Sequence, residues 1–331
     1  MSDKYVISSS PHFKANTNTT KIMGFVLLAL YPQLWAGIKF FGYRAWLVTV
    51  VSIVSCVLFE YLFLKLTKQK NVISNLSACV TGAMLAMVCP PTIPLWMVVL
   101  GAAVAIIVAK GLFGGIGSNV FNPALTGRAV LFISFPTAMG ATWLAPKTIS
   151  AVDAISSATV LSQIKADAFV VNSQSLLDLF IGNKAGCIGE TSILLILISF
   201  IFLLVTKIID WRAPIAMIFT VFICTFIAGA ISASSLQVGF EKGLLSLLTG
   251  GVMFGATFMV TDYATTPVTK PGRLIFGFGC GLITFLIRQF GGYPEGVMFS
   301  ILIMNSIAPF LNNLTVRMYG YGRKKWVQKK I

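Results

Sequence analysis

The sequence is poor in charged residues, above all in acidic residues and histidine. Only 11% of the 331 residues are charged, Asp and Glu number 10, and His12 is the single histidine. A lone histidine excludes a histidine cluster for metal binding or catalysis, so we expect no metal site. The chain has no GxxxxGK[ST], GxGxxG or Ser/His/Asp arrangement. A soluble-type hydrolase or NTPase is therefore not expected.

Cysteines are few and lack metal-site spacing. None forms a CxxC pair, and five of the six fall in apolar runs, which favours buried thiols over an iron–sulfur ligand shared with another subunit. We also expect no secretory signal, because residues 1–20 are polar and no small-residue cleavage site follows the first apolar run. The cysteines are Cys56, Cys79, Cys89, Cys187, Cys224 and Cys280.

Apolar residues, by contrast, dominate the chain. They make up 56% of it, and the mean hydropathy is +0.87. The apolar runs predict an all-α polytopic membrane protein with about ten spans of roughly 17–24 residues. The third, fifth and eighth runs are short, or rich in Gly, Asn and Pro, as broken helices are. The predicted spans are 22–40, 45–64, 73–89, 95–112, 120–135, 191–206, 213–231, 244–260, 273–289 and 296–312.

The net charge of +15 is a topology signal rather than a nucleic-acid-binding face. With ten spans both termini share one side, and seventeen of the 25 Lys and Arg fall there; seven lie on the other side and Arg128 lies within a span. The positive-inside rule then places both termini in the cytoplasm. The expected layout is a cytoplasmic tail (1–21), a first membrane repeat (22–135), an extracytoplasmic loop (136–190), a second membrane repeat (191–312) and a basic cytoplasmic tail (313–331).

Short motifs of the first half recur in the second half in the same order. "CPPTIP" (89–94) resembles "TPVTKP" (266–271), and "FGG" at 113–115 recurs at 290–292. Both pairs are separated by 177 residues. Because each half would hold five spans, an odd number, the second copy would lie inverted relative to the first. We expect two inverted five-helix repeats, with chance matching of common residues as the alternative.

Such repeats place broken helices near the membrane midplane. The candidates are "GGIGSNVFNPALTGR" (114–128) and "TDYATTP" (261–267). Within the first, Asn119 and Asn122 offer amide donors and acceptors that suit the ring edge of a flavin; helix capping is the simpler interpretation. "NPA" is also an aquaporin motif, but no second copy occurs in this chain.

Ionisable residues in or near the predicted spans are candidates for function because their burial in lipid is costly. Asp262, beside the broken eighth span, is the best candidate for a gate or a cation contact on an ion path. Lys110 and Arg288 lie near span ends, where snorkelling explains them at least as well. Glu60 also lies near a span end and is expected to face the interface.

The long polar interval contains the most specific pattern, "VDAISSATVL" (152–161). It is similar to the D-x-x-S-G-A-T pattern that a flavin transferase reads when it joins FMN phosphate to a Thr hydroxyl. A phosphoester needs an open approach to one hydroxyl, which small neighbours allow. A Ser/Thr-rich turn before a helix is the alternative. The residues of this pattern are Asp153, Ser156, Ser157, Ala158 and Thr159.

Long motifs along nearly the whole chain resemble one family, the D subunit of Rnf electron-transport complexes, homologous to the B subunit of the sodium-translocating NADH:quinone reductase. The stretches are "SSPHFKANTNTTKIM" (9–23), "GGIGSNVFNPALTGRA" (114–129), "VDAISSATVL" (152–161), "IGETS" (188–192), "DWRAP" (210–214), "PVTKPGRLIFG" (267–277) and "RQFGGYPEGVMFSILIMN" (288–305).

The resemblance implies a membrane flavoprotein that passes electrons between ferredoxin and NAD, coupled to Na⁺ or H⁺ movement. It implies covalent FMN on Thr159 at the outer face and noncovalent riboflavin near Asn119 and Asn122. It further implies a prokaryotic cytoplasmic membrane, a flavin transferase, and partner subunits, among them a second covalent-FMN subunit. One departure is Ser157, where the pattern has Gly. The alternatives are an inverted-repeat transporter without a redox cofactor and a scaffold with unmodified Thr159.

Overall fold

The chain is helical throughout the part that the structure describes. The structure is a computed structural model that describes residues 18–69, 73–141, 143–144, 146, 160–165, 173–293 and 295–318. No β-strand occurs within these ranges. The predicted all-α class is confirmed for this part of the chain.

The first group of helices contains both long and interrupted members. α1 begins after Asn18, whose side chain accepts a hydrogen bond from Lys21 N at 2.9 Å, and ends at Gly42, where φ is 83°. α4 continues directly into a π-helical segment, a form often found at functional sites. The group comprises α1 (Thr19–Phe41), α2 (Tyr43–Leu66), α3 (Ser77–Met87), α4 (Leu95–Ala103), the π-helical segment Val104–Gly111 and α5 (Pro123–Ser134).

The second group follows a region of short helices and contains a sharp break. α11 and the α12 segment that follows it are bent by 61° relative to each other. The short helices are α6 (Pro136–Gly140), α7 (Val160–Lys165), α8 (Ser173–Ile181) and the 3₁₀ turn Ile188–Glu190. The second group comprises α9 (Ile193–Val205), α10 (Arg212–Ala233), α11 (Leu236–Leu248), α12 (Val252–Phe254) with the π-helical segment Gly255–Met259, α13 (Lys270–Phe290) and α14 (Val297–Met318).

Five of the described helices, α1, α2, α10, α13 and α14, are long and apolar enough to cross a membrane. The bent pair of α11 with α12 raises this number to six, and four shorter apolar helices lie at Ser77–Met87, Leu95–Gly111, Pro123–Ser134 and Ile193–Val205. Each predicted span therefore overlaps a helix, but four of these helices are shorter than a span, and the break falls in the predicted eighth span. The multi-pass character is clear, whereas the count of ten remains a prediction.

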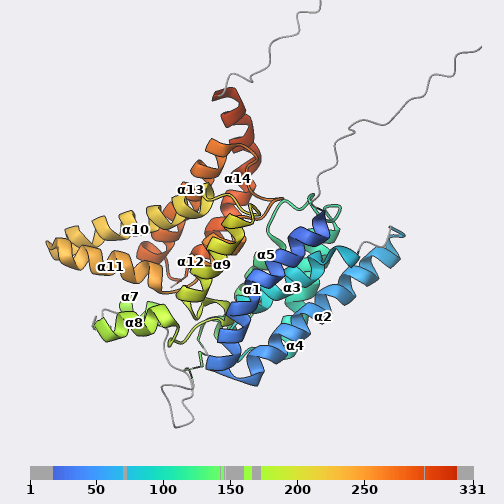
Figure 1. The fold of residues 1–331 in the computed structure, drawn as a ribbon, viewed down its shortest axis with the longest axis horizontal. Helices are drawn as coiled ribbons and strands as arrows, with labels where there is room; N and C mark the ends of the chain where they lie inside the picture. Colours follow the sequence, from blue (N-terminus) through green and yellow to red (C-terminus); the bar gives the residue numbers. More distant parts are fainter. Residues whose placement is uncertain are drawn as a thin grey trace, which may run out of the picture.

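The two groups lie side by side, with α9 between them (Figure 1). Gln33 of α1 donates to Ser199 Oγ of α9 at 2.9 Å, inside the protein. Close helix contacts depend on small residues, as in other membrane proteins. A Cβ atom on Gly277 of α13 would clash with the Ala213 carbonyl oxygen of α10, and one on Gly82 of α3 would lie 2.7 Å from Ile53 Cα of α2.

Both segments predicted as broken helices contain long non-helical stretches in the structure. Residues 112–122, ahead of α5, contain Gly114, Gly115 and Gly117 with φ of +106°, +90° and +84°. This left-handed backbone favours glycine. Residues 260–269, ahead of α13, form the second stretch.

The cysteines are free thiols in the described structure. Cys56, Cys89, Cys187 and Cys280 are buried, in agreement with the expected role in packing. Cys79 and Cys224 are half-buried. No group of three or more potential metal-binding side chains occurs among the described residues.

Candidate functional site

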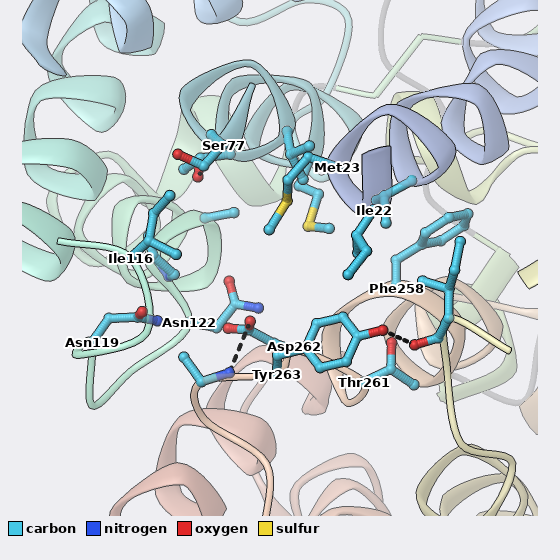
Figure 2. Close-up of a pocket in the computed structure, with 18 of the residues that line it drawn as sticks. Ile22, Met23, Ser77, Ile116, Asn119, Asn122, Phe258, Thr261, Asp262 and Tyr263 are labelled. Atoms are coloured by element: carbon cyan, nitrogen blue, oxygen red, sulfur yellow. Dashed lines mark hydrogen bonds between the residues drawn. The ribbon is translucent and has the colours of Figure 1, made fainter. Parts of the chain in front are cut away.

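The two non-helical stretches meet at a cavity between the helix groups. The cavity encloses about 890 Å³ when the space at its open mouth is included. Its walls come from α1, α3, the end of α9, the turn before α5 and the stretch after α12. Figure 2 shows Asn119, Asn122 and Asp262 gathered on one side, with Ile22 and Met23 across from them. An apolar chamber with one polar edge results.

Asn122 is fixed at the N-terminus of α5. Its Oδ1 accepts a hydrogen bond from Leu125 N at 3.2 Å, so it caps the helix, and Pro123 follows at the first helical position. Its backbone N–H donates to the side-chain oxygen of Asn305 on α14, 3.1 Å away. Both predicted roles are therefore compatible: Oδ1 caps the helix, while Nδ2 has no partner in the described structure and borders the cavity.

Asn119 connects the same turn to the second broken segment. Its Nδ2 donates to the Phe121 carbonyl at 3.1 Å, and the side chain is also within hydrogen-bonding reach of Asp262. Asp262 in turn accepts from Thr265 Oγ1 at 3.2 Å and from Ala264 N at 3.5 Å. Residues far apart in sequence thus form one polar cluster. Its remaining hydrogen-bonding groups border the cavity.

Lys110 and Glu60 form a buried ion pair at the edge of this cavity. Lys110 Nζ lies 2.6 Å from Glu60 Oε1 and donates to Ser77 Oγ at 2.6 Å. Lys110 is only 4% exposed and Glu60 6% exposed, so the expected snorkelling lysine and interface-facing glutamate are both wrong. The physical reason is that each charge is neutralised by the other inside the protein, which is cheaper than leaving either unpaired in lipid.

A second charged cluster lies at the end of α13. Arg128 of α5, buried as predicted within a span, pairs with Glu295 at 2.6 Å. Arg288 does not snorkel: it donates to the Ser246 carbonyl at 2.7 Å and to the Thr249 carbonyl at 3.3 Å. Glu295 is not among the residues predicted from the sequence. Its signal was a lone carboxylate in the "YPEG" loop, without any visible partner nearby in sequence.

The predicted flavin-attachment pattern, Asp153, Ser156, Ser157, Ala158 and Thr159, lies outside the described residues. The next residues along the chain, Val160 and Leu161, are described. They line a small cavity together with Lys184, Glu190 and Glu295. The chain that leaves the pattern thus enters the charged cluster directly.

Asp210, between α9 and α10, is the centre of a further ion-pair group that sequence reasoning missed. It accepts from Arg212 at 2.8 Å and from Arg273 of α13 at 2.7 Å. Partial burial pushes the pKa of Asp210 upward, but the hydrogen bonds from Arg212 and Arg273 outweigh it and hold the pKa below its usual value. The "DWRAP" stretch contained both charges of the local pair.

Comparisons with known proteins show the family of this chain. Residues 6–320 match the profile of the NQR2, RnfD, RnfE family. The chain belongs to this family. It is 40% identical over 320 residues to the D subunit of the proton-translocating ferredoxin:NAD(+) oxidoreductase complex of Clostridium ljungdahlii, with 94% of each chain covered.

Two further relatives of the NQR2, RnfD, RnfE family extend the comparison. The chain is 40% identical over 322 residues to the D subunit of the Na(+)-translocating ferredoxin:NAD(+) oxidoreductase complex of Acetobacterium woodii, with 96% of each covered. It is 35% identical over 340 residues to the D subunit of the ion-translocating oxidoreductase complex of Stutzerimonas stutzeri, with 93% of each covered. The first two relatives are named for different ions.

Proposed function

We propose that this chain is the D subunit of an ion-translocating ferredoxin:NAD⁺ oxidoreductase of the Rnf type, a membrane flavoprotein subunit. The observation that carries the proposal is the 40% identity to two such subunits along almost the whole chain. Other membrane and peripheral subunits complete the complex. One of them carries a second covalent FMN, and a flavin transferase matures both.

The first cofactor is FMN, joined through its phosphate to the Thr159 hydroxyl. The pattern from Asp153 to Thr159 supports this assignment, because small neighbours leave the hydroxyl open. Ser157 in place of Gly adds only a CH₂OH group. A flavin accepts one or two electrons, and the protein supplies its position and its electrostatic surroundings. Lys184 and Arg288, near Val160 and Leu161, are the described cations next to this part of the chain.

The second cofactor is riboflavin, held in the cavity beside Asn119 and Asn122. The residues fit this group: Asn122 Nδ2 is an available donor, Asn119 Oδ1 is an available acceptor, and the opposite wall is apolar. The ring edge of a flavin has both donors and acceptors, which such a pair of amides matches. Asp262 lies against Asn119 and is the proposed contact for the transported cation.

The membrane arrangement follows the charge distribution. We infer ten spans in two inverted five-helix repeats, both termini in the cytoplasm of a prokaryotic cell, and residues 136–190 on the outer face. The sharp bend between α11 and α12 supports a broken span in the second repeat. FMN on Thr159 then sits on the outer side.

The test is Thr159→Ala in the complex co-expressed with its flavin transferase. The wild-type subunit is expected to fluoresce in a denaturing gel under ultraviolet light and to carry the FMN mass on the loop peptide. Thr159→Ala removes the proposed acceptor hydroxyl, so both signals should be lost. Thr148→Ala, a hydroxyl deletion elsewhere in the loop, should keep both. Fluorescence that survives in Thr159→Ala would contradict the attachment site.

The same measurement separates the two other functions. An inverted-repeat transporter would use the cavity for a solute, and a scaffold subunit would leave Thr159 bare. Wild-type protein without the FMN mass, despite an active transferase, would favour either of these. Denaturation of the purified complex and measurement of the released flavin then distinguish the transporter from the scaffold. A transporter would not be expected to release flavin from the cavity.

A further inference from the structure

The break between α11 and α12 is surrounded by charged side chains from four other elements. At the carboxyl end of α11, Lys184 Nζ donates to the Leu248 carbonyl at 2.6 Å, and Arg288 donates to the Ser246 and Thr249 carbonyls. These cations satisfy carbonyl groups that a broken helix leaves unpaired. They are therefore committed to the backbone rather than to a carboxylate.

At the amino end of α12, Glu295 accepts hydrogen bonds instead of donating them. Its Oε1 accepts from Gly251 N at 2.8 Å, and its Oε2 pairs with Arg128 at 2.6 Å. Both oxygens thus accept hydrogen bonds from strong donors. This pattern is that of an ionised carboxylate.

Glu190 lies against Glu295 without a cation of its own. A Cβ atom on Gly251 would lie 2.5 Å from Glu190 Oε1 and 2.7 Å from Glu295 Oε1, so the two carboxyl groups face the same glycine and are near neighbours. Glu190 is 5% exposed, and its Oε1 has no hydrogen-bond partner among the described residues. Two ionised carboxylates this close repel each other, and one proton shared by the pair removes the repulsion.

We propose that Glu190 and Glu295 form a binding site for one exchangeable proton, which Glu190 carries. In the loaded state Glu190 is a neutral acid that donates to the Glu295 carboxylate. On release, its O–H bond breaks, the proton passes to water in the adjoining cavity lined by Leu161, and Glu190 keeps the negative charge. No electron moves in this step.

The surroundings allow both states of the site. The charged and titratable groups that face Glu190 are Glu295, Arg128, Arg288, Lys184 and Cys187. Three of these groups, Arg128, Arg288 and Lys184, are cations, and one, Glu295, is a carboxylate. Loss of the proton therefore leaves no uncompensated negative charge, whereas like-charge repulsion between the carboxylates favours rebinding.

The site goes beyond the proposed function and does not depend on it. It lies beside Val160 and Leu161, the residues that follow Thr159, so it is close to the loop from which we infer electron transfer. It consists of described residues alone. A pH titration tests it without any electron flow and whether or not Thr159 bears FMN.

The experiment compares Glu190→Gln, Glu295→Gln and Glu241→Gln in the intact, purified complex. Infrared difference spectra are recorded between low and high pH in H₂O and D₂O, and thermal unfolding of this subunit is followed in parallel. Glu241, on α11 and bonded only to Gln237 nearby, is the control. We expect a deuterium-sensitive C=O band of a protonated carboxyl that titrates in the wild type and in Glu241→Gln but is lost in Glu190→Gln.

The unfolding temperatures add a second criterion. Gln at position 190 keeps the shape and the donor of a protonated acid, so no change is expected. Gln at position 295 leaves Arg128 unpaired and should lower the unfolding temperature by roughly 5–10 °C. A titrating band that persists in Glu190→Gln would overturn the proposal. A fall in unfolding temperature in Glu190→Gln as large as that in Glu295→Gln would also overturn it, because it would mean that Glu190 is ionised. Carboxylate bands that respond to Na⁺ at fixed pH instead of to protons would overturn it as well.

Discussion

Single side chains in this protein divide their hydrogen bonds between the fold and the cavity. Asn122 illustrates the division, since its oxygen caps α5 and its NH₂ group is left for a ligand. Asp262 is held by Thr265 and Ala264, and its contact with Asn119 places a carboxylate beside the amides. The same few atoms therefore support both local structure and binding. Mutations there need to be chosen so that only one role changes.

Asn122→Asp and Asp262→Asn separate these roles. Asp is as good a helix cap as Asn, so Asn122→Asp should keep the cap of α5 while a carboxylate replaces the NH₂ donor; because the side chain is buried, the added charge should also lower stability. We expect noncovalent flavin content to fall about tenfold, which corresponds to the loss of roughly one hydrogen bond. Asp262→Asn should keep the flavin but impair ion-coupled electron transfer in vesicles. The measurements are released flavin per complex and ion uptake per NADH formed. Unchanged coupling in Asp262→Asn would remove this residue from the ion path.

The residues of the cavity could be predicted only in part. Asn119, Asn122 and Asp262 stand in Gly-, Pro- and Thr-rich segments that interrupt apolar runs, and the structure brings these segments together. Asn305 gave no signal, because one amide within an apolar helix looks like any interhelical hydrogen bond. Glu190 likewise could not be predicted, because its neighbour Glu295 is far away in the sequence.

Individual helices are joined at their ends by ion pairs outside the apolar segments. Asp210, in the connection from α9 to α10, reaches Arg273 at the start of α13. This contact ties the start of α13 to the connection between α9 and α10. It borders a groove that shares Tyr263 and Asp262 with the central cavity.

Asp210→Asn should destabilise this joint in a pH-dependent way. Because the pKa of Asp210 is held below its usual value, its stabilisation is present above the ordinary carboxyl range, about pH 4, and is lost as the pH falls through the lower native value. We expect a loss on the order of 1 kcal/mol at neutral pH after solvent screening, and none in acid. Thermal unfolding of detergent-solubilised complex at several pH values measures it, with Glu241→Gln as the control. An equal deficit at every pH would show that the ion pair is not the cause.

The broken helices were easy to recognise in the sequence, but their boundaries were hard to predict. Gly, Asn and Pro content predicts breaks at 114–128 and 261–267, whereas the non-helical stretches are 112–122 and 260–269, and residues 123–128 belong to α5. The π-helical winding of Val104–Gly111 and Gly255–Met259 gave no signal, because nothing in the composition of these segments distinguishes a π-helix from an α-helix. Tertiary packing around the cavity decides their winding.

At the scale of the whole molecule, the two helix groups are joined by α1 with α9 and by α5 with α14. The Gln33–Ser199 and Asn122–Asn305 hydrogen bonds lie in these contacts. Polar bonds inside an apolar interface fix one arrangement, since separating them would leave buried polar groups unpaired.

The proposed orientation predicts which surface residues are accessible from outside the cell. Ser234, in the exposed connection between α10 and α11, and Lys68, in the exposed connection after α2, lie on opposite sides in a ten-span topology. A membrane-impermeant maleimide should label Ser234→Cys in intact cells and Lys68→Cys only after lysis, in a background without the native cysteines. The reverse pattern would invert the topology, and labelling of both in intact cells would show that the span count is wrong.

One consequence concerns the order in which the protein is made. Asn122 belongs to the first half of the chain, yet its backbone partner Asn305 is on the last helix. A ribosome releases α5 long before α14 exists, so the amide turn stays incomplete until synthesis is nearly finished. Loading of the proposed riboflavin would thereby be deferred until the full-length polypeptide has been inserted, and a late nonsense mutation would prevent it.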